Sequence, residues 1–97
     1  MHVGTCIVRL RLPGNDSLKG KRQVRRSIVD QVKHRFDVAI AEVEDMDSWQ
    51  RLTLGITCVS NSAPHANEML SKVVDFIDAG KFDAAMLDYE IEIIDAF

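Results

Sequence analysis

Residues 17–36, SLKGKRQVRRSIVDQVKHRF, decide the fold of this chain because they predict an amphipathic helix. Apolar residues recur there at three- and four-residue spacings, so they share one side of an α-helix. Ser17 or Asp16 supplies an N-cap whose side chain accepts hydrogen bonds from the free N–H groups of the first turn. We expect a helix that ends near Arg35 and buries a stripe made of Leu18, Val24, Ile28, Val29, Val32 and Phe36.

Alternating apolar residues predict strands on both sides of this helix. Residues 2–12 alternate, and the turn formers of residues 13–16 end that strand. Residues 36–44 predict a second strand, and residues 51–60 a third, so the polar residues 45–50 form the tip of a hairpin. The register of the second strand stays open, because Val38 and Ile40 compete for the buried face with Ala39, Ala41 and Val43.

The remaining third of the chain predicts one more helix and one more strand. Ser62 caps the helix, Pro64 is tolerated in its first turn, and Gly80 ends it. Residues 83–95 then alternate as a strand. The order β-α-β-β-α-β predicts one α+β domain over residues 1–97, a ferredoxin-like sandwich with a four-stranded antiparallel sheet and two helices on one face. Right-handed crossovers place the first and third strands in the centre.

Charge is divided unevenly along the chain. The formal net charge is −3, but residues 1–41 carry +6 and residues 42–97 carry −9. Residues 17–36 alone hold seven of the twelve Lys and Arg residues. Such opposed potentials on one small domain can steer a charged partner.

The basic residues of the first helix are the candidate nucleic-acid contacts. Several of them lie in the first turn, where the helix dipole disfavours cations by about 0.3–1 kcal/mol each. One interpretation is a surface that contacts phosphates, and the other is a solvated face paired with Glu68, Asp75 and Asp78 on the second helix. The candidate contacts are Lys19, Lys21, Arg22, Arg26, Lys33 and Arg35.

The sheet and the hairpin tip offer fewer candidates. No aromatic residue lies on the predicted open face of the two central strands, and Arg9 and Arg11 are expected to pair with Asp88, Glu90 and Glu92 of the last strand. Trp49 at the hairpin tip is a candidate partner anchor, but the favoured expectation is that its ring folds back over the end of the core.

No constellation of catalytic or metal-binding residues stands out. Glu42, Glu44, Asp45 and Asp47 form an acidic cluster that is expected to be solvated at the tip, and the three histidines are scattered. Cys6 and Cys58 match neither a disulfide framework nor a zinc pattern and are expected to be reduced core thiols. We therefore expect no enzyme activity, no cofactor and no metal.

Several short motifs together resemble the YlxP-like family of small, uncharacterised bacterial proteins. The resemblance covers nearly the whole chain and implies a ferredoxin-like fold but no activity; the neighbours of the family's genes suggest a role near RNA or the ribosome. Gly20 and Arg25 depart from the family pattern, which has an acid and an apolar residue there. The motifs are Pro13-Gly14, Ser17-Leu18-Lys19, Lys21-Arg22, Arg35-Phe36-Asp37-Val38, Ala41-Glu42-Val43, Asp47, Trp49-Gln50-Arg51 and Leu54-Gly55.

Two functional hypotheses follow. The first is a non-enzymatic cytoplasmic protein that docks on RNA, such as ribosomal RNA, or on the ribosome through the basic helix. The alternative is a self-associating module, a homodimer that pairs edge strands or open sheet faces and binds a protein partner or small ligand between subunits. We expect no membrane association, because no apolar run reaches the ~20 residues of a membrane span.

Overall fold

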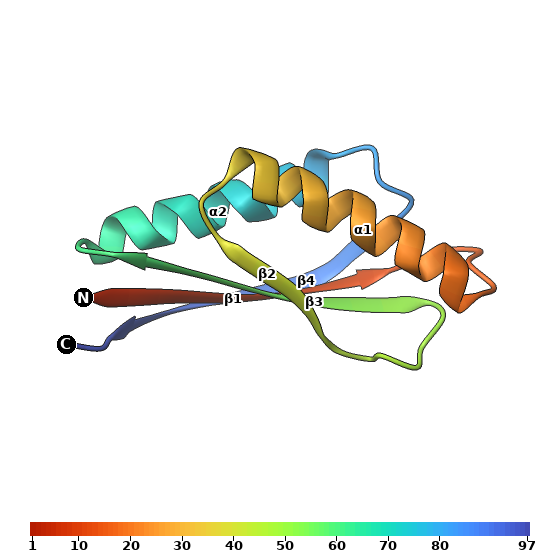
Figure 1. The fold of residues 1–97 in the computed structure, drawn as a ribbon, viewed down its shortest axis with the longest axis horizontal. Coiled ribbons are helices and arrows are strands. Elements are labelled where there is room, and N and C mark those ends of the chain that lie inside the picture. Colours follow the sequence, from red (N-terminus) through yellow and green to blue (C-terminus); the bar gives the residue numbers. More distant parts are fainter.

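The fold is a four-stranded antiparallel sheet covered on one face by two helices. The computed structural model describes residues 1–97, and the strand order across the sheet is β2-β3-β1-β4. The predicted ferredoxin-like order and the central position of the first and third strands are confirmed (Figure 1). The elements are β1 (His2–Arg11), α1 (Leu18–Arg35), β2 (Ala39–Glu44), β3 (Arg51–Ser60), α2 (Ala63–Ala79) and β4 (Ala85–Asp95).

The core lies between the sheet and the two helices. Alternate residues of β1 and β3 point toward the helices, as period-two patterning requires. The α1 stripe contributes Ile28 and Val32, and Val24 and Val29 pack at its margin. The largest fully buried side chains are Leu12, Ile28, Leu52, Leu54 and Leu70, followed by Val8, Val32, Val73 and Thr53.

Both helices begin at the predicted caps. The Ser17 hydroxyl accepts a hydrogen bond from the Gly20 N–H at 3.0 Å, and the Ser62 hydroxyl accepts from the His65 N–H at 3.3 Å. Each bond satisfies one of the N–H groups that a first helical turn leaves free. Gly80 ends α2 as expected, and Phe36 ends α1 in extended conformation.

Helix α2 approaches β1 most closely at Gly4. A Cβ atom at this position would lie 2.8 Å from Leu70 Cδ1 and 3.0 Å from Cys58 Sγ. The missing side chain therefore lets α2 sit close to the sheet and fixes the depth of the core at this point.

The register of β2 is settled by packing. Ile40 is buried beneath α1, whereas Ala39, Ala41 and Val43 are exposed on the other face. The alternation places the side chain of Glu42 on the same buried face as Ile40. After Glu42 a bulge shifts the pairing with β3. A carboxylate therefore occupies the last inward position of β2.

Neither helix combines the length and the hydrophobicity needed to cross a membrane.

Candidate nucleic-acid interface

Five of the six predicted contact residues lie exposed on α1. Lys19, Arg22, Arg26, Lys33 and Arg35 are all exposed, and no carboxylate lies within ion-pair distance of any of them. The alternative in which Glu68, Asp75 and Asp78 neutralise them is wrong, because Glu68 pairs with Lys72 and the two aspartates make no ion pair. These five cations of α1 face solvent without an ion pair.

Four of these residues form a row, which we call the basic row: Lys19, Arg22, Arg26 and Lys33. Their spacing of three, four and seven residues keeps them on one flank of the helix. The row extends about 21 Å along the axis, at 1.5 Å per residue. Arg35 lies apart from it, with its guanidinium carbon 4.7 Å from the centre of the Phe76 ring.

Lys21 does not belong to this surface. Its prediction as a nucleic-acid contact is wrong, because the residue is buried. Only 2% of the residue is exposed. Its ammonium donates to the backbone carbonyls of Asp45 and Ser48, the latter at 2.8 Å, and lies 2.8 Å from Glu42 Oε2. A buried cation with three oxygen partners is a structural group that a solvated polyanion cannot reach.

Glu42 joins Lys21 to Arg25 in a buried ion cluster. The Glu42 side chain is 5% exposed, and its second oxygen accepts from Arg25 Nη1 at 2.9 Å. Arg25, with 34% of its side chain exposed, pairs with this carboxylate at the edge of the core. We call Lys21, Arg25 and Glu42 the buried cluster.

The sequence contained a signal for the buried cluster. Lys21 precedes Val24, Ile28 and Val32 by three, seven and eleven residues, which places it on the apolar stripe of α1. Glu42 follows Ile40 by two residues, on the buried face of β2. A cation and an anion at inward positions of adjacent elements together predict a buried ion pair, because neither charge is stable in a core without the other.

The acidic cluster expected at the hairpin tip is divided by the fold. Glu42 is buried in β2, Glu44 and Asp47 are exposed, and Asp45 accepts from the Thr53 hydroxyl at 2.8 Å. No group of three or more His, Cys, Asp or Glu side chains is placed to hold a metal ion.

Trp49 projects from the hairpin tip, residues 45–50. Trp49 is 53% exposed, so the expectation that its ring folds back over the core is wrong. The backbone of the tip is held firmly: Asn15 donates to the Trp49 carbonyl, and the Leu12 N–H donates to the Gln50 carbonyl at 2.8 Å. The tip lies at the same end of the molecule as the start of α1 (Figure 1).

The sheet face opposite the helices, which we call the open face, carries the predicted charge ladder in part. Arg9 donates to Asp88 at 2.8 Å and to Glu90 at 3.2 Å, and these hydrogen bonds raise the pKa of Arg9. Arg11 pairs with no carboxylate: Ala85 lies opposite it, and Asp88, the carboxylate of β4 nearest in register, lies opposite Arg9 and pairs with it. Cross-strand pairing therefore explains Arg9 alone.

The two thiols are buried and unreactive in character. Burial raises the pKa of Cys6 from its ordinary value of 9.0 to about 11, and it raises the pKa of Cys58 as well. Neither cysteine forms a disulfide. Since the thiolate is the nucleophilic form, neither sulfur is activated for chemistry.

Comparison with known proteins identifies the family. The family described as "Protein of unknown function (DUF503)" matches residues 3–91. The chain belongs to this family. It is also 41% identical, over 63 residues, to a protein of Bacillus subtilis (strain 168) described as "Uncharacterized protein YlxP"; the match covers 65% of this chain and 68% of that protein. The resemblance to YlxP-like proteins is confirmed, and the DUF503 family description assigns no activity.

Solved structures are similar in fold. "De novo designed protein Foldit4" has a TM-score of 0.54 at 10% identity, with both chains fully covered. A structure titled "Structure of the REP associates tyrosine transposase bound to a REP hairpin" has a TM-score of 0.45 at 14% identity, covering 98% of this chain and 57% of that one. The designed protein supports the ferredoxin-like architecture, and the second likeness is too low to support any inference.

The substitution Lys21→Met should destabilise the protein by about 3–5 kcal/mol, because it leaves the carboxylate of Glu42 and two carbonyls without their buried partner. The matched control is Lys19→Met, the same change at an exposed position of the same helix, which should leave stability unchanged or raise it by up to about 1 kcal/mol, because it removes a cation from the first turn. Urea denaturation measures both. Equal effects of the two substitutions would show that the buried cluster contributes nothing specific.

Stability should fall between about pH 9 and pH 11. The folded state raises the thiol pKa of Cys6 from 9.0 to about 11, so across this range the unfolded chain loses a proton that the folded chain keeps. The free energy of unfolding, measured by denaturation at several pH values, should therefore decrease with rising pH. The Cys6→Ala variant should show a shallower decrease, and an unchanged slope would contradict this assignment.

Proposed function

We propose that this protein is a non-enzymatic cytoplasmic factor that binds the phosphate backbone of RNA through the basic row of α1. The observation that carries the proposal is that Lys19, Arg22, Arg26 and Lys33 are exposed on one flank and unpaired. A chain with a net charge of −3 has ample carboxylates, yet none forms an ion pair with these four cations; Asp30, one turn from Arg26 and Lys33, is the one acid on α1. A polyanionic partner would supply the missing charges.

Helix stability alone does not account for these cations. The first turn of α1 contains no acid, although the helix dipole favours acids there and disfavours Lys19 and Arg22. The cost is about 0.3–1 kcal/mol for each exposed cation. A compensating role in binding explains why Lys19 and Arg22 lie at the unfavourable end of the helix, whereas Lys33 lies in the last turn, where the dipole favours a cation.

Trp49 supports RNA as the polyanion. Its exposed ring lies on the tip that Asn15 ties to the start of α1, the end of the molecule that also carries Lys19 and Arg22. A ring near phosphate-binding cations can stack on an unpaired base while the cations hold the backbone. Ribosomal RNA, the target that the family resemblance suggests, offers such bases in its loops.

Binding to a labelled single-stranded RNA should weaken steeply with salt. Four phosphate contacts predict a slope of about −3 in a plot of log binding constant against log salt concentration. The variant R22E/R26E should reduce the magnitude of that slope by roughly half and weaken binding at every salt concentration. Fluorescence anisotropy across a salt series measures both quantities.

The control for this experiment is Lys72→Glu on α2, compared with Arg26→Glu alone, which makes the same change in net charge on the basic row. The control should leave the slope unchanged. Equal weakening by the two single variants would mean that only overall charge matters. Absence of binding by the parent protein, even at low salt and with intact ribosomal subunits as the probe, would refute the proposal.

Trp49→Ala should weaken binding to single-stranded RNA by about 1–3 kcal/mol without changing the salt slope, because stacking involves no counterion release. Binding to fully paired RNA should be unaffected, since no base is free to stack. Trp49 is the only tryptophan, so quenching of its fluorescence by RNA reports the contact directly. Equal losses on both kinds of RNA would contradict a stacking role.

A further inference from the structure

The open face of the sheet exposes a continuous apolar surface. Val43, Val59 and Ile94 are 50%, 67% and 43% exposed, and all three belong to the face away from the helices. Val3 and Ile7 of β1 lie between them and are only partly buried. The two helices cover the other face (Figure 1), and the chain covers the open face only around Thr53, which is buried and donates a hydrogen bond to Asp45 of the hairpin tip.

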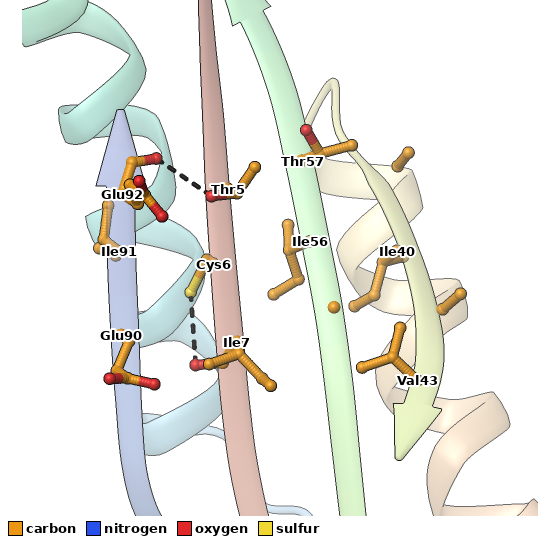
Figure 2. Close-up of a pocket in the computed structure, with 13 residues that line it drawn as sticks. Thr5, Cys6, Ile7, Ile40, Val43, Ile56, Thr57, Glu90, Ile91 and Glu92 are labelled. Atoms are coloured by element: carbon orange, nitrogen blue, oxygen red, sulfur yellow. Dashed lines mark hydrogen bonds between the residues drawn. The ribbon is translucent and has the colours of Figure 1, made fainter. Parts of the chain in front are cut away.

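The centre of the open face is hollow. A cavity of about 760 Å³ crosses all four strands, and small side chains form much of its lining. Ile7 and Val43 lean toward each other across β3 at Gly55, where the missing side chain makes room for Val43 (Figure 2). Glu90 and Glu92 of β4 form one wall.

Charge is arranged with opposite signs toward the two ends of this face. Arg11 and Arg51 lie directly opposite each other, exposed and without a carboxylate in ion-pair distance. Like charges placed in this way destabilise a strand pair. Glu92 lies opposite Thr5, six residues along β1 from Arg11. At 3.3 Å per residue this is about 20 Å from the two arginines. Glu92 has no cationic partner.

We propose that the open face is the interface with a second copy of this chain, packed face to face with its strands antiparallel. A two-fold axis that lies across the strands brings Arg11 and Arg51 of each copy toward Glu92 of the other. The arrangement is self-complementary, because each copy contributes one positive end and one negative end. It also covers the exposed apolar side chains of both copies.

Charge excludes the other symmetric arrangements. Pairing of β4 with β4 of a second copy along their edges would place Asp88, Glu90 and Glu92 opposite the same residues. A two-fold axis along the strands would lay the carboxylates of β4 over Ala39, Ala41 and Val43 of β2, where no cation meets them. The antiparallel face-to-face arrangement instead brings the unpaired Arg11 near the unpaired Glu92 of the other copy. It also lays β4 over β4, where Arg9 of each copy neutralises Asp88 and Glu90.

The area of the face suits a weak dimer. Four strands about 4.8 Å apart and nine residues long at about 3.3 Å each give roughly 570 Å² per copy. The two copies together would remove roughly 1,100 Å² from water, just above the ~1,000 Å² expected of a specific interface. Helix α1 lies on the opposite face and stays free, so this inference does not depend on RNA binding.

Sedimentation velocity over a range of protein concentrations tests the proposal on the full chain. The parent protein should form a concentration-dependent dimer. Glu92→Arg alone and R11E/R51E alone should each shift the protein to monomer, because each places like charges together. The triple variant R11E/R51E/E92R should restore the dimer, and the control Lys81→Glu should leave it unchanged.

A second variant tests the apolar part of the face. Val43→Lys, at an exposed position on β2, should also give monomer, with a thermal unfolding transition that confirms the fold. A parent protein that is monomeric at all concentrations would overturn the proposal. So would a dimer that survives both charge reversals, or a monomer in which R11E/R51E abolishes RNA binding, since the arginines would then belong to an RNA surface.

Discussion

The ion pair between Lys21 and Glu42 is the interaction on which the arrangement of this molecule depends. It joins the first turn of α1 to the last inward position of the edge strand β2, at 2.8 Å and almost without solvent. Burying two charges costs several kcal/mol for each ion before their attraction is counted. The cost is offset in part here, because Arg25 donates to one oxygen of Glu42 and two backbone carbonyls accept from Lys21; the other oxygen of Glu42 has the Lys21 charge beside it but no hydrogen-bond donor.

This cluster does more than join a helix to a strand. Since Lys21 also holds the carbonyls of Asp45 and Ser48, it fixes both sides of the hairpin tip against α1. Asp45 has a φ angle of 58°, an unfavourable conformation for a residue with a side chain, and its hydrogen bond from Thr53 helps to hold it. A buried cation thus holds the tip that carries the exposed Trp49 at the end of the molecule where α1 begins.

Two surfaces of opposite character result from this architecture. The outer side of α1 carries cations that find no partner within the chain, while the open face carries apolar side chains between separated positive and negative ends. Because the sheet lies between them, a partner on one surface leaves the other accessible. A small two-layer domain can in this way present one surface to a polyanion and keep the other for a second copy of itself.

The sequence by itself determined the order of elements, both helix caps and the inward face of β1 and β3, because periodicity and capping are local properties. It also marked Lys19, Arg22, Arg26 and Lys33 as one flank. Only the tertiary structure decided which cations are free. Lys21 is buried and Lys19 is exposed, although both lie in the same basic run, because the environment of a side chain depends on the neighbour packed against it, here β2 with its inward Glu42.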